Sequence, residues 1–102
     1  GAGVVDAARG PELPVAVALG PAYPNPAAAE ARIAYTLPAA ADVHLAVFDV
    51  LGRRVAVLVD GLRPAGTHTA RFDAGAVASG LYLYRIEAGS FSKVKKLLRV
   101  RY

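Results

Sequence analysis

The sequence contains no cysteine, so neither a disulfide nor a thiolate metal site can support its fold. It also lacks any apolar run close to the roughly 20 residues that cross a bilayer, since stretches such as Val55 to Val59 are far shorter. No basic region followed by a hydrophobic run marks an export signal at its N-terminus. We therefore expect a soluble piece that folds by packing alone. Because it starts at Gly1 rather than methionine, we also expect a longer parent protein.

Acidic residues are missing from the end of the sequence, although the net charge of the whole is only +4. Five of the twelve Lys and Arg residues fall among the last ten residues, which contain no Asp or Glu. These five are Lys93, Lys95, Lys96, Arg99 and Arg101. Aromatic residues precede them, so the segment predicts an edge strand protected by charge, a nucleic-acid patch or a recognition tag.

The groups that carry catalysis or bind metals are also scarce. His44 and His68 are the only histidines and have no cysteine beside them, too few ligands for structural zinc. No clustered acidic spacing suits calcium, no serine stands in a nucleophile elbow, and no glycine-rich phosphate loop is present. We expect no enzyme activity, no cofactor and no metal.

Short segments rich in β-branched and aromatic residues, separated by turn residues, occupy most of the chain after residue 32. This spacing predicts an all-β fold, an immunoglobulin-like antiparallel β-sandwich of about seven strands, with a small barrel as the alternative. The expected inward residues of the first five strands include Ile33, Tyr35, Leu37, Val43, Leu45, Val47, Ala70, Phe72, Tyr82, Tyr84 and Ile86.

Turn residues separate these strands. Asp49 is expected to accept backbone hydrogen bonds in a hairpin connection where Gly52 takes a positive φ. A strand from Arg54 to Val59 should end at a turn formed by Asp60 and Gly61. Residues 62–66 would then form a longer connection to the next strand.

The first 22 residues, rich in Pro, Gly and Ala, predict a linker or docking segment, with an edge strand conceivable at residues 15–19. The domain proper would cover residues 23–102. It begins with Tyr23-Pro24-Asn25-Pro26, a loop that should be rigid because each proline fixes its own φ and restricts the preceding residue. A rigid loop favours either a defined entry into the first strand or a recognition role.

The final strand predicts two unlike faces. Alternation places Val94, Lys96, Leu98 and Val100 on the inner face, and Lys93, Lys95, Leu97, Arg99 and Arg101 on the outer face. The same alternation turns Tyr82 and Tyr84 toward the core, which argues against nucleic-acid binding. Lys96 is then anomalous, because a lysine among inward apolar residues must reach a rim or a partner.

The order of five motifs resembles one known family. They are Tyr23 to Pro26, Val47 to Val55, Pro64 to His68, Ala78 to Tyr84 and Lys95 to Leu97. Together they resemble the type A C-terminal sorting domain of the type IX secretion system, and the related immunoglobulin-like domain of flagellar hook-capping proteins. Two departures are Ala27-Ala28-Ala29, where an aromatic residue usually follows the Pro-Asn-Pro, and Phe72, where Trp is common.

The resemblance implies a β-sandwich at the end of a larger secreted protein of a Gram-negative bacterium, which carries its passenger across the outer membrane. The outer-membrane secretion machinery would recognise the final hairpin and the terminal strand. In that family a lysine at the place of Lys96 belongs to the terminal signal. The recognition residues expected on this basis are Lys95, Lys96, Arg99, Arg101, Gly80, Tyr82 and Tyr84.

Three functional hypotheses remain. The first is a noncatalytic sorting module, linked through residues 1–22 to an upstream passenger that is released at the cell surface or into the medium. The second is a structural subunit or spacer of an extracellular filament, which would self-associate by strand addition at its edges, for instance through residues 15–19. The third is an accessory domain of a secreted glycoside hydrolase, for which too few aromatic residues remain once the core is filled.

Overall fold

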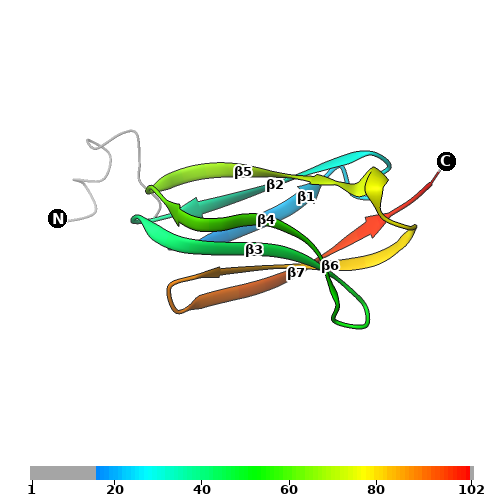
Figure 1. Ribbon diagram of the computed structural model, residues 1–102. Coiled ribbons are helices and arrows are strands. Elements are labelled where there is room, and N and C mark those ends of the chain that lie inside the picture. Colours follow the sequence, from blue (N-terminus) through cyan, green and yellow to red (C-terminus); the bar gives the residue numbers. More distant parts are fainter. Residues whose placement is uncertain (1–15, 102) are drawn as a thin grey trace.

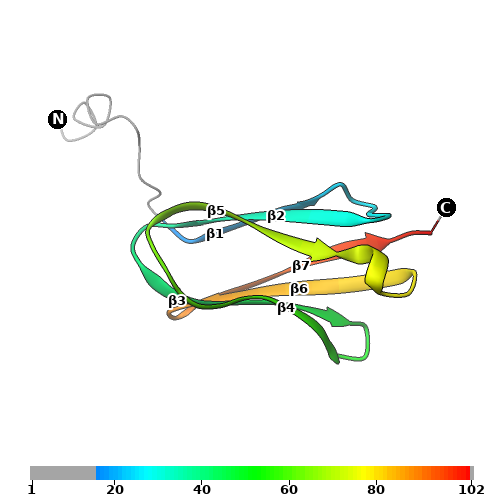
Figure 2. The same cartoon turned by 45° about the horizontal axis from the view of Figure 1, so that its top comes forward.

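The computed structural model describes residues 16–101 as two layers of antiparallel strands (Figure 1). The elements are β1 (Ala18–Tyr23), β2 (Glu30–Leu37), β3 (Ala41–Asp49), β4 (Arg54–Arg63), β5 (Gly66–Asp73), the short 3₁₀ helix η1 (Ala74–Ala76), β6 (Gly80–Ala88) and β7 (Phe91–Arg99). One sheet has the order β1-β2-β5 and the other β4-β3-β6-β7. Figure 2 shows the two layers facing each other, with the β3–β4 hairpin bending away from the body. The all-β, immunoglobulin-like sandwich expected from the strand spacing is confirmed.

The core lies between the two sheets and consists of alternate residues from the strands. The inward faces expected for β2, β3, β5 and β6 are all buried, because strict alternation over these strands leaves only one face apolar enough to cover. Tyr84 is fully buried, and its hydroxyl donates a hydrogen bond of 2.9 Å to the carbonyl oxygen of Gly20, which joins β6 to β1 in the opposite sheet. Tyr82 donates in the same way to the carbonyl oxygen of Ala78, at 2.6 Å.

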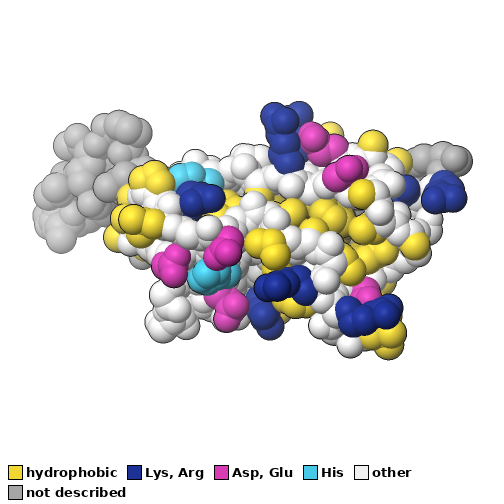
Figure 3. All heavy atoms as spheres, in the orientation of Figure 1, with side chains coloured by type: hydrophobic (Ala, Val, Ile, Leu, Met, Phe, Trp, Pro, Cys, Tyr) yellow, Lys and Arg dark blue, Asp and Glu magenta, His cyan; other side chains and the backbone are white. Residues whose placement is uncertain are grey.

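The sheets are not closed at their sides. Strands β4 and β5 are neighbours in sequence but belong to different sheets and do not pair. Figure 3 shows hydrophobic side chains in the band between them. The structure is therefore a sandwich with open strand edges, and the barrel alternative is wrong.

Two expected boundaries are also wrong. Asp60 and Gly61 form no turn: both remain in β4, where Gly61 pairs with Val43 at a φ of 141°. The cross-strand pairing with β3 continues to Arg63, so the local turn signal is overridden and only two residues connect β4 to β5. The edge strand expected at residues 15–19 is β1, which starts at Ala18 and pairs with β2. Residues 1–15 lie outside the described part of the chain.

Within residues 16–101, no helix is long and apolar enough to cross a membrane.

Candidate recognition surface

Strand β7 forms one edge of the four-stranded sheet, and its register is set by a tight hairpin with β6. Ala88 pairs with Phe91 across the two residues Gly89 and Ser90, and Gly89 takes a φ of 60°. From this turn the ladder runs without a register shift to the pair of Gly80 and Arg99. Because directly paired residues point to the same face, the inward side chains of β6 determine which residues of β7 point inward.

The predicted faces of β7 are wrong, because this register reverses them. Leu97 pairs with Tyr82 and is fully buried, whereas Lys96 pairs with Leu83 on the outer face and is exposed. Val94 and Leu98, expected inside, are 49% and 40% exposed. Lys96 is therefore not an inward lysine. Lys95, predicted to be outside, is half-buried opposite Tyr84.

Arg99, also predicted to point outward, is the most buried charged residue of the described chain at 5% exposure. Its guanidinium donates hydrogen bonds to the carbonyl oxygens of Ala74 and Val100. The first of these contacts ties the end of β7 to η1, in the connection between β5 and β6. Arg99 therefore holds the terminal strand in place and offers little surface to a partner.

The loop Tyr23-Pro24-Asn25-Pro26 contacts the outer edge of β7. The side chain of Asn25 accepts a hydrogen bond from the Leu98 N–H at 3.0 Å and donates one to the Lys96 carbonyl at 3.3 Å. Both peptide bonds that precede the prolines are cis. The loop expected as a rigid entry into the first strand instead joins β1 to β2, and it contacts the last strand.

Ala27 continues this contact with its backbone. Its N–H donates to the Leu98 carbonyl at 2.8 Å, and its carbonyl accepts from the Val100 N–H at 3.0 Å, so that Ala27 forms a parallel bridge with Arg99. The side chain of Ala27 is fully buried. We call Asn25, Ala27 and the β7 groups that they bind the edge clasp.

The β3–β4 hairpin has the turn chemistry expected of it. Asp49 Oδ1 accepts hydrogen bonds from the N–H groups of Leu51 and Arg53, both at 2.9 Å, and Oδ2 accepts from Arg53 Nε at 2.8 Å. The backbone hydrogen bond from Arg53 is the main reason why the pKa of this carboxyl is lowered. Gly52 has a φ of 82°, as the turn requires. These contacts engage both carboxylate oxygens of Asp49 within its own turn.

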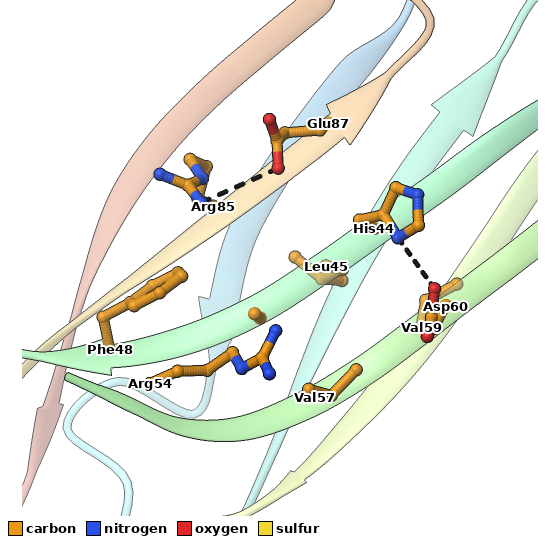
Figure 4. A pocket seen from close by; sticks show the side chains of 10 residues that line it. His44, Leu45, Phe48, Arg54, Val57, Val59, Asp60, Arg85 and Glu87 are labelled. Carbon is orange, nitrogen blue, oxygen red and sulfur yellow. Dashed lines mark ion pairs between the residues drawn. The ribbon is translucent and has the colours of Figure 1, made fainter. Parts of the chain in front are cut away.

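A shallow groove of about 180 Å³ lies on the outer face of the four-stranded sheet (Figure 4). His44 Nδ1 lies 2.8 Å from Asp60 Oδ1. Arg85 Nη2 lies 3.7 Å from Glu87 Oε1, and the Arg85 guanidinium lies 4.8 Å from the centre of the Phe48 ring. Asp42 approaches the other ring nitrogen of His44 at 3.4 Å. His44 and Arg85 are therefore each paired with an acidic side chain of the groove. Within residues 16–101, no three His, Cys, Asp or Glu side chains are placed to hold a metal ion.

Residues 21–100 match the family model of the secretion system C-terminal sorting domain, a region from β1 to just beyond β7. The chain belongs to this family. The resemblance to sorting domains of the type IX secretion system, first seen in the order of the motifs, is thereby confirmed. No curated protein and no solved structure matches the chain.

Strand β7 of the sorting domain carries four cations and no acidic residue. Lys93 and Lys96 are exposed, as is Arg101 just beyond the strand. None of the ion pairs recorded within residues 16–101 involves a lysine of β7, and the acid nearest in register, Glu87, pairs with Arg85. The cations that sequence reasoning selected thus divide into exposed ones, Lys96 and Arg101, half-buried Lys95 and buried Arg99.

The remaining selected residues of the sorting domain fall on β6. Tyr82 and Tyr84 face the core as expected, and Gly80 begins the strand at a φ of 152° opposite Arg99. These three residues of β6 pair with Arg99, Leu97 and Lys95 and so hold β7 in register. What the sequence did not indicate is the edge clasp, because no local pattern links Asn25 to Leu98 across 73 positions.

Proposed function

We propose that this domain is a noncatalytic sorting module that directs a larger passenger through the bacterial outer membrane to the cell surface or the medium. Membership in the sorting-domain family supports a role in export and a partner in the secretion machinery. We further propose that the passenger lies upstream, is linked through the residues that precede β1 and is released there, since residues 18–22 belong to the sandwich itself. The domain acts by binding and performs no chemistry.

The observation that carries this proposal is the basic terminal strand. β7 presents Lys96 and, just beyond it, Arg101 to solvent, while Leu97 and Arg99 anchor the same segment from inside. An anchored strand loses little conformational entropy when a partner binds to it. We propose that Lys96 and Arg101 contact the machinery directly, with Lys95 at the rim, whereas Arg99, Gly80, Tyr82 and Tyr84 hold the strand in position.

The loop Tyr23-Pro24-Asn25-Pro26 has a second place in this proposal. It lies against the C-terminal half of β7 and binds backbone groups of Lys96 and Leu98. The loop would therefore keep the terminal strand in the shape that the machinery recognises. Its role is positioning, and its four residues are all exposed, Tyr23 at 69%.

Charge reversal at exposed positions tests the proposal without disturbing the core. A passenger fused to the domain is expressed in a bacterium with a type IX system, with Lys96 and Arg101 both changed to Glu. We expect the passenger to be retained inside the cell. Deletion of residues 95–102 is a poorer test, because it also removes buried Leu97 and Arg99 and so unfolds the domain.

The matched control changes two other exposed cations, Arg54 of β4 and Arg71 of β5, to Glu. This control has the same net charge but leaves β7 intact, and we expect it to be exported like the unchanged fusion. Immunoblots of the cell and medium fractions measure both. Normal export of the Lys96→Glu, Arg101→Glu fusion would overturn the proposal.

A further inference from the structure

The outer edge of β7 is only half covered. The edge clasp binds the carbonyls of Lys96 and Leu98 and the N–H groups of Leu98 and Val100. All of these groups belong to even-numbered residues. Since backbone groups alternate between the two sides of a strand, the odd-numbered residues of β7 face β6 and the even-numbered ones face away from it.

The same alternation extends toward the hairpin, because the ladder with β6 has no register shift. The N–H and carbonyl groups of Ser92 and Val94, and the N–H of Lys96, therefore point away from the sheet. Within residues 16–101, no backbone hydrogen bond outside the sheets reaches these groups. We call residues 92–96 the open edge. Unpaired groups of this kind are a template for an added strand.

The charge around the open edge decides which strand it accepts. Lys93, Lys95 and Lys96 lie on it. The acid nearest in register, Glu87, is already paired with Arg85. A second copy of this edge would place lysines against lysines, which like-charge repulsion disfavours. A strand with acidic side chains would instead be attracted to both sides of the edge.

We propose that the open edge binds an extended acidic segment of the secretion machinery by β-strand addition. The added strand would continue the line that Asn25 and Ala27 already form along the other half of β7. Backbone hydrogen bonds to residues 92–96 hold it, and the lysines select its charge. This inference rests on the proposed function and specifies how the terminal strand is recognised.

A binding experiment on the 102-residue chain uses a synthetic peptide of alternating Glu and Val, which models an acidic strand. The control peptide alternates Lys and Val. We expect the acidic peptide alone to bind, more weakly as salt increases, and to protect the amides of Val94 and Lys96 from hydrogen exchange. Absence of binding, equal binding of both peptides, or self-association through β7 in light scattering would overturn the proposal.

Two variants locate the contact. Val94→Pro removes one N–H from the open edge but none from the β6–β7 ladder, a change that edge strands tolerate. Lys96→Glu leaves the backbone intact and repels an acidic strand. We expect each to weaken peptide binding roughly tenfold. Leu62→Pro, at an outward-facing position of the opposite edge strand β4, is the matched control and should bind normally.

The passenger fusion separates this inference from the proposed function. If strand addition is the mode of recognition, Val94→Pro blocks export as the Lys96 and Arg101 reversals do, while Leu62→Pro does not. Normal export of the folded Val94→Pro fusion, with export still blocked by the charge reversals, would overturn strand addition alone. Normal export of both the Val94→Pro fusion and the fusion with the Lys96 and Arg101 reversals would overturn the sorting role itself.

Discussion

The side chain of Asn25 takes the place of a peptide group beside Leu98. Its oxygen accepts the Leu98 N–H at 3.0 Å, and its nitrogen donates to the carbonyl of Lys96 at 3.3 Å, as a neighbouring strand would. The two residues lie 73 positions apart. The loop between β1 and β2 thereby holds the last strand of the sandwich, so the first and last motifs of the family pattern form one structural unit.

Asn25→Ala should loosen this unit. It removes both side-chain hydrogen bonds at a solvent-exposed site, so we expect the free energy of unfolding to fall by about 1 to 2 kcal/mol. Asn25→Asp keeps the acceptor for Leu98 but loses the donor to Lys96, so its free energy of unfolding should lie between those of the unchanged chain and Asn25→Ala. Urea denaturation measures both effects. If hydrogen exchange at Leu98 does not speed up in Asn25→Ala, the clasp does not hold the strand.

Most of the sandwich could be predicted from alternation, but the faces of β7 could not be read in this way. The strand has apolar residues on both faces, and counting them favours Val94, Leu98 and Val100 as the inner set. The hairpin turn decides otherwise. Ala88 continues the inward series of Tyr82, Tyr84 and Ile86, and it pairs with Phe91 across only two residues, which turns the odd-numbered residues of β7 inward.

Other features were beyond sequence reasoning for a different reason. The Asp60-Gly61 signal is real, but pairing with β3 overrides it, and pairing partners are not visible in the sequence. Arg99 carries no sequence sign of burial, because only the fold brings the Ala74 carbonyl within its reach. The edge clasp likewise depends on contact between distant segments. Local chemistry, such as the hydrogen bonds of Asp49 within its own turn, was predictable.

The faces that the register gives to β7 can be checked with substitutions at two neighbouring residues. Lys96→Ala should leave the free energy of unfolding within about 0.5 kcal/mol of the original, because the side chain is exposed. Leu97→Ala empties a fully buried position and should cost about 2 to 5 kcal/mol. Thermal and urea unfolding compare the two. Equal effects, or a larger loss for Lys96→Ala, would contradict the register.

Arg99→Leu tests the buried guanidinium as an anchor. The leucine has a similar apolar stem but leaves the carbonyl of Ala74 without its donor, so we expect a loss of about 2 kcal/mol in stability. Hydrogen exchange should quicken around η1 as well as at the end of β7. Arg101→Leu, at an exposed position two residues further on, is the control and should change neither. Equal stability of both variants would show that Arg99 is not an anchor.

The buried tyrosine of β6 should make stability depend on alkaline pH. Burial raises the pKa of Tyr84 above its ordinary value of 10.0, so the folded state holds the phenol proton more tightly than the unfolded state does. The stability that the protonated Tyr84 contributes is fully present below about pH 10, and it is lost as the pH rises from there through the pKa of the folded state. Burial raises the pKa of Tyr35 too, which adds to the decline.

Tyr84→Phe separates the two effects of the hydroxyl. At neutral pH the variant lacks the hydrogen bond to Gly20 and should be less stable by about 1 kcal/mol. Above about pH 10 the unchanged chain loses stability through Tyr84 while the variant does not, so the difference between them should shrink. Urea denaturation at a series of pH values from neutral to alkaline measures it. A constant difference over the whole series would mean that Tyr84 does not titrate differently in the folded and unfolded states.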